Sequence, residues 1–280
     1  MKPEDFDLFS TLVKQRSGLL LTREKAYLLE SRLLPVVRKY NLRSLDDMAQ
    51  SVRSQRNEAM MADITEAMTT NESSFFRDQK PFTLFQKVLL PQFLESRATK
   101  RHIRIWSAAT SSGQEAYSIA MICQEEASQL QGWKIDIIGT DLSREMIECA
   151  KGGIYTQFEV QRGLPITMLA KYFQQLGNDR WQIKDNLRQM VQFREGNLLQ
   201  DFGSIGSFDI VYCRNVLTYF DIPTKTRVLE AIRGVMPTDG VLLLGGAETI
   251  LGISDTFKPM EGQQGVYGAA NISVARTAAV

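Results

Sequence analysis

The fold is decided by the stretch Ile103-Arg-Ile-Trp-Ser-Ala-Ala-Thr-Ser-Ser-Gly-Gln-Glu-Ala-Tyr-Ser-Ile-Ala120. Its first residues are β-formers in a short run that ends in small residues, which predicts a strand. After Gly113 the apolar residues recur at intervals of three and four, as on one face of a helix: Ala116, Ile119, Ala120 and Cys123. A strand, a turn of small residues and a helix open a nucleotide-binding α/β unit, in which a ligand approaches the turn.

The composition of this turn indicates the kind of ligand. It has a single glycine, Gly113, and the residues around it are small: Ser107, Ala108, Ala109, Ser111 and Ser112. A dinucleotide site needs further glycines so that the backbone can reach a pyrophosphate. A nucleoside cofactor without phosphates does not need them, so the turn favours S-adenosylmethionine (SAM).

Two acidic residues are candidates for contacts with such a cofactor. The β-rich run Lys134 to Asp141 ends in a carboxylate, which can accept hydrogen bonds from both ribose hydroxyls at the end of a second strand. The alternative for Asp141 is a helix N-cap, because Ser143 and an apolar segment follow. We favour ribose binding, since the strand-turn-helix unit precedes Asp141 at the right distance. Glu115 would be favoured in a first helical turn by the helix dipole alone, but in this turn it is a second candidate, for ribose or for the methionyl ammonium.

Composition excludes several classes of protein. The chain has 280 residues, 44% of them hydrophobic, which is enough for a large core and one or two domains. A net charge of +1 argues against binding nucleic acid through overall charge. The single histidine, His102, precedes the first strand and is expected at the surface, so a Ser-His-Asp or Cys-His mechanism is disfavoured. The cysteines form no C-x-x-C pair, and we expect reduced, buried thiols without a disulfide framework or a metal site: Cys123, Cys149 and Cys213.

The chain contains no run of about 18 apolar residues and begins with no signal peptide, so we expect a soluble, cytoplasmic protein without membrane insertion. Pro35 is expected to kink or divide a helix of the N-terminal segment. The expected divisions are a helical N-terminal domain (1–70), a linker and helix contributing to the cofactor site (71–100), a SAM-binding α/β domain (101–270) with an inserted β-subdomain (152–190), and a disordered tail (271–280).

The helical segment carries an excess of positive charge. Residues 11 to 57 contain ten basic and four acidic residues. This excess is either a solvated outer face or a surface that attracts an acidic partner. Under the second interpretation we expect a substrate-docking surface that includes Arg32, Arg38 and Lys39.

Five motifs, in the same order along almost the whole chain, together resemble the CheR family of chemotaxis receptor glutamate O-methyltransferases. They are Asn71-x-Ser-x-Phe-Phe-Arg77, Trp106-Ser-Ala-Ala with Ser112-Gly113-Gln-Glu115, Thr140-Asp141, Asn197-Leu198-Leu199 and Cys213-Arg214-Asn215-Val216-x-x-Tyr219-Phe220. The resemblance implies an all-helical N-terminal domain, followed by a Rossmann-like SAM-dependent methyltransferase domain with a small inserted β-subdomain. It also implies methylation of glutamates on the cytoplasmic helical part of chemotaxis receptors, giving methyl esters and S-adenosylhomocysteine.

The resemblance further implies roles for individual residues. Linker positions that close over SAM are Asn71, Ser73 and Arg77, with Ser73 where the family often has threonine. The remaining cofactor positions are Ala108, Gly113, Glu115, Asp141, the adenine-side pair Asn197 and Leu198, and the pair Arg214 and Asn215. Tyr219 matches a tyrosine near the transferred methyl group, and we assign it, with Arg77, to catalysis.

Two departures from the family pattern limit this comparison. Ala116 stands where a proline is common, at a helix N-terminus where the exchange should be harmless. The turn from Leu176 to Arg180 is short beside members whose β-subdomain binds a pentapeptide at the receptor's C-terminus. We therefore expect no pentapeptide tethering, and we expect a monomer.

The chemistry requires no catalytic base. A glutamate is already ionised near neutral pH, so no proton has to be removed before it attacks the sulfonium methyl group. Arg77 or Arg214 can orient that carboxylate, or either can hold the methionyl carboxylate, and the sequence leaves both assignments open. Tyr219 can position the acceptor oxygen, or it can be a core aromatic residue beside Phe220.

Other functions share the same cofactor fold. The run from Phe208 to Cys213 is expected to form the fourth strand. A base-amine methyltransferase typically has Pro-Pro-aromatic after the Asn or Asp that follows this strand, whereas Asn215 is followed by Val216 and Leu217. A small-molecule O-methyltransferase would need a base or a metal. A non-catalytic SAM-binding signalling adaptor is the alternative from another class, and intact Tyr219 and Arg77 count against it.

Overall fold

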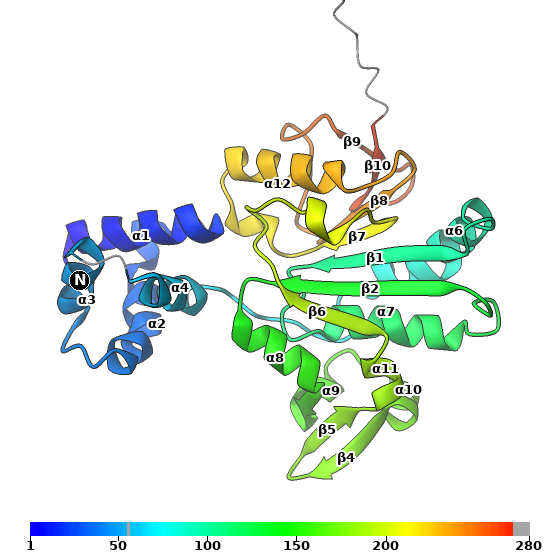
Figure 1. Cartoon of the computed structure of the whole chain (residues 1–280), viewed down its shortest axis with the longest axis horizontal. Helices are drawn as coiled ribbons and strands as arrows, with labels where there is room; N and C mark the ends of the chain where they lie inside the picture. Colours follow the sequence, from blue (N-terminus) through cyan, green and yellow to red (C-terminus); the bar gives the residue numbers. More distant parts are fainter. Residues whose placement is uncertain (55–56, 271–280) are drawn as a thin grey trace, which may run out of the picture.

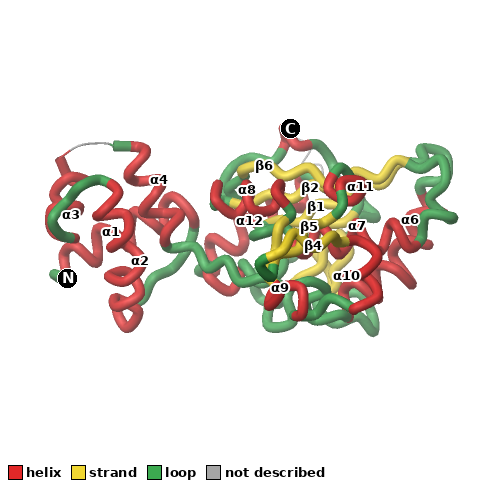
Figure 2. Tube along the Cα trace, turned by 90° about the horizontal axis from the view of Figure 1, so that it is seen from below, coloured by secondary structure: helices red, strands yellow, loops and turns green. Residues whose placement is uncertain are grey.

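The computed structural model describes residues 1–54 and 57–270; the expected tail at 271–280 lies outside them. Four helices form a separate bundle at one end of the molecule, coloured blue in Figure 1 and on the left in Figure 2. They are α1 (Pro3–Ser17), α2 (Ala26–Lys39), α3 (Leu45–Ser54) and α4 (Glu58–Ala67), with a short 3-10 turn at Arg23–Lys25. The bundle has its own apolar core, which includes Phe9, Leu33 and Ile64.

Pro35 does not divide its helix, contrary to expectation. Helix α2 continues from Ala26 to Lys39 through Pro35. Leu33 on one side and Val36 on the other are both buried in the bundle core, so packing holds both halves in line. Pro35 itself is exposed, where water can satisfy the carbonyl group that the proline leaves without a partner.

The larger part of the chain is built on a seven-stranded sheet of order β6-β2-β1-β7-β8-β10-β9. The parallel strands are β1 (His102–Ala108), β2 (Lys134–Asp141), β6 (Val191–Glu195), β7 (Ile210–Cys213) and β8 (Val241–Leu244). An antiparallel hairpin closes the sheet, formed by β9 (Phe257–Pro259) and β10 (Val266–Ala269). This arrangement confirms the Rossmann-like fold expected from the sequence.

Helices cover both faces of the sheet. One face packs against α7 (Gln114–Glu125), α8 (Arg144–Gly152) and the segment formed by α5 (Lys80–Leu84), a π-helical turn (Phe85–Leu89) and α6 (Leu90–Ser96). The other face packs against α12 (Ile222–Gly234). Along β1 the side chains alternate between these layers, so Ile105 lies in the first core and Trp106 in the second. Because the parallel strands all end at one edge, the loops that follow them gather there (Figure 1).

The inserted segment forms a separate three-stranded antiparallel sheet of order β3-β5-β4, below the main sheet in Figure 1. Its elements are β3 (Ile154–Thr156), α9 (Gln157–Gln161), α10 (Ile166–Tyr172), β4 (Phe173–Gly177), β5 (Arg180–Ile183) and α11 (Asp185–Arg188). The expected inserted β-subdomain is therefore present. Helix α10 ends at Tyr172, because Phe173 is buried and pairs with Ile183 in the sheet. Two 3-10 turns complete the chain, Gly203–Ile205 and Leu217–Tyr219.

Two further expectations need correction. Cys149 is exposed, whereas Cys123 and Cys213 are buried as expected. His102 is the first residue of β1 and is half-buried, with its Nε2 atom 2.9 Å from a carboxylate oxygen of Asp136. It therefore lies at the amino end of the sheet, opposite the edge where the ligand-binding loops gather. No helix in residues 1–54 or 57–270 is both long and apolar enough to cross a membrane.

Candidate active site

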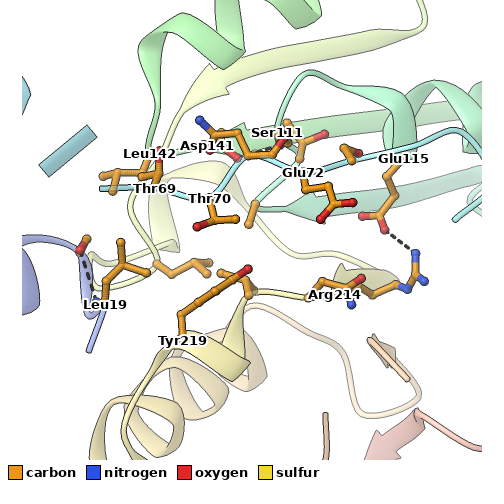
Figure 3. A pocket seen from close by; sticks show the side chains of 18 of the residues that line it. Leu19, Thr69, Thr70, Glu72, Ser111, Glu115, Asp141, Leu142, Arg214 and Tyr219 are labelled. Atoms are coloured by element: carbon orange, nitrogen blue, oxygen red, sulfur yellow. Dashed lines mark hydrogen bonds and ion pairs between the residues drawn. The ribbon is translucent and has the colours of Figure 1, made fainter. Parts of the chain in front are cut away.

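A cavity lies at the carboxyl edge of the parallel strands, with about 890 Å³ of free space that is partly open to solvent (Figure 3). Its walls come from the linker after α4, the loops that follow β1, β2, β6 and β7, and the end of α1. The polar side chains that the sequence singled out can therefore be placed relative to one cavity.

The loop after β1 folds sharply back toward the end of β2. Ala109 and Ser111 have φ values of 63° and 52°, and Gly113 has a φ of 92° where α7 begins. A side chain at Gly113 would place its Cβ 2.9 Å from the Cβ of Ala150, so only glycine fits here. The fold of this loop directs the backbone N–H of Ser111 toward Asp141.

Asp141 lines the cavity and is 7% exposed. Its two carboxylate oxygens accept hydrogen bonds from the backbone N–H of Ser111 at 2.7 Å and of Ser143 at 2.9 Å. Burial raises the pKa of Asp141, and these two hydrogen bonds oppose that shift. The N-cap of α8 is Ser143, whose hydroxyl accepts from the N–H of Met146. Capping is thus carried out by Ser143, and Asp141 faces the cavity.

Arg214 lies in a network of charges and is 6% exposed. Its guanidinium donates to Glu115 at 2.9 Å, a contact drawn in Figure 3, and to Asp78 at 2.6 Å. It also donates to the carbonyl oxygen of Arg77, while its Nε has no partner among the described residues. Glu115 in turn accepts a hydrogen bond from Ser107. Two carboxylates therefore already compensate the charge of Arg214.

Arg77 is placed differently from Arg214. It lines the cavity, is half-buried, and donates to the carbonyl oxygen of Glu72 at 2.9 Å. In the part of the chain that the structure describes, Arg77 forms no ion pair. Of the two arginines that the sequence left undecided, Arg77 thus has the charge available to a bound carboxylate. Asp78, which is paired with Arg214, was not found from the sequence, although it directly follows the motif that ends at Arg77.

The remaining linker residues also reach the cavity. Asn71 and Ser73 both line it, and the carbonyl oxygen of Asn71 accepts a hydrogen bond from the hydroxyl of Ser111 at 2.8 Å. Two residues expected at the cofactor do not line the cavity. Ala108 is fully buried in the core, and Gly113 is in the turn before α7, packed against Ala150 and Phe193. Ala109 takes the lining position beside Ala108.

The loops after β6 and β7 supply the other side of the cavity. Asn197 and Leu198 line it, and the side-chain amide of Asn197 donates to the carbonyl oxygen of Arg16 at 2.6 Å. Asn215 has a φ of 59° and lines the cavity as well. Tyr219 is half-buried, packing against the core on one side and lining the cavity on the other (Figure 3).

Glu248 holds the loop after β7 and was not found from the sequence. Its carboxylate accepts backbone N–H groups from Asn215 at 2.7 Å, Gly245 at 2.7 Å and Thr218 at 3.2 Å. Glu248 follows β8 at the carboxyl edge of the sheet, which is the only sequence signal that could have identified it. The side chain fixes the loop between Asn215 and Tyr219.

The end of α1 also contributes to the cavity, which the sequence did not indicate. Ser17 and Leu19 line it, and the N–H of Leu20 donates to the carbonyl oxygen of Tyr219 at 2.9 Å. Gly18 ends α1 with a φ of 80°, and a Cβ there would lie 2.9 Å from the Cγ2 of Thr224. The helical bundle therefore closes over the cavity by close backbone contact.

The three residues expected to dock substrate have different surroundings. Arg32 donates to the carbonyl oxygens of Met68 and Thr69, both at 2.9 Å, at the start of the linker. Lys39 is paired with Asp63 at 2.7 Å. Arg38 is exposed and has no ion pair within residues 1–54 and 57–270. Arg38 is thus the member of the set whose charge is fully available to a partner.

Comparison with known proteins gives a consistent result. The model of the CheR methyltransferase all-alpha domain matches residues 4–69, and that of the CheR methyltransferase SAM binding domain matches residues 71–266. The chemotaxis protein methyltransferase of Vibrio anguillarum is 39% identical over 265 residues, which are 94% of this chain and 95% of that protein. Chemotaxis protein methyltransferase 1 of Vibrio cholerae is 38% identical with the same coverage, and that of Pseudomonas aeruginosa is 37% identical over 94% of this chain and 96% of that protein.

These matches cover the helical bundle, the linker and nearly all of the α/β domain, and they confirm the resemblance drawn from the motifs. They also agree with the cofactor that the turn after β1 favoured. The chain belongs to the CheR methyltransferase family and is a SAM-dependent methyltransferase.

Proposed function

We propose that the protein methylates glutamate side chains on the cytoplasmic helical part of chemotaxis receptors, giving methyl esters and S-adenosylhomocysteine, for sensory adaptation. The observation that carries this proposal is that one cavity brings together Asp141, Asn197, Tyr219 and Arg77, all of which line it. Such a cavity suits a cofactor that is held by hydrogen bonds at its nucleoside and presents its methyl group near an acceptor. The receptor substrate is also supported by the names of the similar proteins, which are chemotaxis protein methyltransferases.

In this proposal the cofactor lies across the ends of the parallel strands. Asp141 binds the ribose hydroxyls, and Asn197 and Leu198 lie beside the adenine. Glu115 binds the methionyl ammonium. The carboxylates of Glu115 and Asp78 both pair with the single guanidinium of Arg214, so the three side chains together carry a net negative charge that favours a cation. Arg77, whose own charge is uncompensated, binds a carboxylate, either that of the cofactor or that of the substrate glutamate.

The reaction then needs alignment more than acid-base chemistry. An oxygen of the ionised glutamate attacks the methyl carbon as the carbon–sulfur bond breaks, so the carboxylate and the sulfonium both become neutral. Holding the two reactants in line can contribute about 7–11 kcal/mol. Where the bound cofactor and substrate displace water from the cavity, the contacts that hold the reactants become stronger. Tyr219, at the cavity wall, positions the acceptor oxygen.

The finer features of the interaction are also proposals. The receptor docks on the exposed face of α2 around Arg38, where Tyr27 and Leu34 are exposed as well, at 64% and 45%. The two-residue turn Asn178-Asp179 between β4 and β5 is too short to help to hold a receptor C-terminal peptide. The protein acts as a monomer in the cytoplasm and does not bind nucleic acid. Its functional divisions are the helical domain (1–70), the linker and helix (71–100) and the SAM-binding domain (101–270).

The test is transfer of a radiolabelled methyl group from SAM to receptor-containing membranes. Base-labile label on the receptor is expected, since methyl esters hydrolyse in alkali. Alkali-stable label would indicate an amine product, and no label with intact SAM binding would indicate a signalling adaptor. A matched Tyr219→Phe variant is expected to retain SAM binding and to lose much of the transfer rate.

A further inference from the structure

A carboxylate from the helical bundle contacts the first turn of a helix in the α/β domain. Glu66 lies in the last turn of α4, and one of its oxygens accepts hydrogen bonds from the hydroxyl of Ser143 at 2.8 Å and the backbone N–H of Glu145 at 2.9 Å. The first N–H groups of a helix have no partner within the helix. Glu66 therefore caps α8 from another domain, where the helix dipole also favours a negative charge.

Ser143 connects this cap to the cofactor cavity. Its hydroxyl donates to Glu66 and accepts from the N–H of Met146, so both bonds fix its orientation. Its backbone N–H donates to Asp141 at 2.9 Å. A continuous chain of hydrogen bonds thus runs from Asp141, at the cavity, through Ser143 to Glu66 in the helical bundle.

The same glutamate also fixes the start of the linker. The carbonyl oxygen of Glu66 accepts hydrogen bonds from the N–H and the hydroxyl of Thr69, at 3.0 and 2.7 Å. Thr69 lines the cavity and begins the segment that continues to Asn71 (Figure 3). Glu66 does not line the cavity, but it is bonded to Thr69, which does, and to Ser143, which is bonded to the lining residue Asp141.

A simple surface ion pair does not account for these contacts. The oxygen of Glu66 that faces Arg144 lies 3.4 Å from its Nε, and Arg144 is half exposed. Exposed pairs of this kind contribute little. The short bonds go instead to Ser143 and to the backbone of Glu145, which are the groups that define where α8 begins.

We propose that Glu66 is a positioning residue for cofactor binding, acting through Ser143 on Asp141. The proposal rests on the ribose-binding role of Asp141 proposed above. It follows that contacts from the helical bundle contribute to the free energy of cofactor binding. Because such coupling is reciprocal, bound SAM tightens the contact between α4 and α8.

The test measures SAM affinity of the full chain by calorimetry. Glu66→Ala is expected to weaken SAM binding about fivefold to tenfold, the range expected for loss of a helix cap. Glu66→Gln should recover most of this loss, since one amide oxygen can accept both hydrogen bonds. Glu24→Ala, at an exposed glutamate of the same bundle, is the matched control and should bind SAM like the parent protein.

A double-mutant cycle identifies the route through Ser143. Ser143→Ala is expected to weaken SAM binding to a similar degree. The double variant with Glu66→Ala should bind SAM with the same affinity as whichever single variant binds it less tightly. In the parent protein, SAM should slow hydrogen exchange of the backbone at residues 60–69 as well as at 143–147. The exchange measurement and Ser143→Ala keep the proposal testable if Glu66→Ala fails to fold.

Parent-like SAM affinity in a folded Glu66→Ala variant would overturn the proposal, as would equal losses in Glu66→Ala and Glu66→Gln or strictly additive losses in the cycle. Asp141→Ala separates this failure from failure of the proposed site. If Asp141→Ala loses SAM binding while Glu66→Ala does not, only the positioning role is wrong. If Asp141→Ala binds SAM normally, the ribose-binding role itself is wrong.

Discussion

The two walls of the cavity are built in different ways. The wall at the sheet edge presents side chains, such as Asp141, Asn197 and Tyr219, on loops that follow parallel strands. The wall from the helical bundle makes its contacts largely through the backbone, at the carbonyl oxygen of Arg16 and the N–H of Leu20. In the proposed function, the first wall supplies chemical groups for the ligand, and the second holds those groups in place.

This difference predicts different consequences of substitution. Loss of a side chain at the sheet edge removes a contact with the ligand itself. Loss of a contact from the helical bundle leaves every ligand-binding group present but less well positioned. Substitutions in the first wall should therefore have large effects, and those in the second wall moderate ones.

The largest effect is expected for Asp141→Ala. If Asp141 binds both ribose hydroxyls as proposed, removing its buried carboxylate should weaken SAM binding by at least about a hundredfold, because hydrogen bonds to charged groups are strong. Calorimetry with SAM measures the affinity, and circular dichroism checks that the fold is intact. Unchanged affinity would remove Asp141 from the site.

The next largest effect is expected for Glu248→Ala, which tests whether the loop between Asn215 and Tyr219 must be held in place. Three backbone N–H groups lose their acceptor, so kcat should fall about tenfold or more while SAM affinity falls less. Glu248→Gln should be intermediate, because a single oxygen accepts from both Asn215 and Gly245. The control is Glu230→Ala on the exposed face of α12; a Glu248→Ala variant with the parent's kcat would contradict this role.

A moderate effect is expected for Gly18→Ala in the wall from the helical bundle. The added Cβ strains a backbone with a φ of 80° and approaches Thr224 and Phe220, so the end of α1 must move away from the cavity. We expect SAM binding about fivefold weaker and a loss of about 1–2 kcal/mol in the free energy of unfolding. Gly234→Ala, where a Cβ meets nothing within 4 Å, is the control and should change neither quantity much. If Gly18→Ala bound SAM normally, the bundle would not be part of the site.

The smallest effect is expected for Arg38→Glu, which separates docking from positioning. Reversing this exposed charge should raise the KM for receptor about threefold and leave SAM affinity unchanged, since a single exposed charge contributes little. Arg32→Glu should differ, because Arg32 holds the carbonyl oxygens of Met68 and Thr69 at the start of the linker. We expect it to lower SAM affinity as well. Identical profiles for the two variants would show that Arg32 and Arg38 act on the same step.

The sequence predicted the wall at the sheet edge well, for a physical reason. Strand ends, turn residues and charged groups at fixed spacing are local patterns, and parallel strands bring their ends together at one edge. Asp141 and Tyr219 could thus be assigned to the same edge from the sequence. The cofactor and the family followed from the same local motifs.

The wall from the helical bundle could not be predicted in the same way. The contacts of Arg16, Leu20 and Glu66 depend on how two separately folded units dock, and no local pattern encodes that geometry. Arg32 shows the limit clearly, since its position on α2 suggested an outward-facing charge, whereas the structure directs it to the linker. Pro35 does not end its helix for a related reason. The tertiary packing of Leu33 and Val36 outweighs the local tendency of proline to interrupt a helix.

The most direct test of the central claim is a crystal structure of the full chain with S-adenosylhomocysteine. We expect the ligand across the ends of β1, β2 and β6, with its ribose hydroxyls on Asp141 and its sulfur facing Tyr219. A ligand bound among α1–α4, or elsewhere on the molecule with these strand ends empty, would contradict the account.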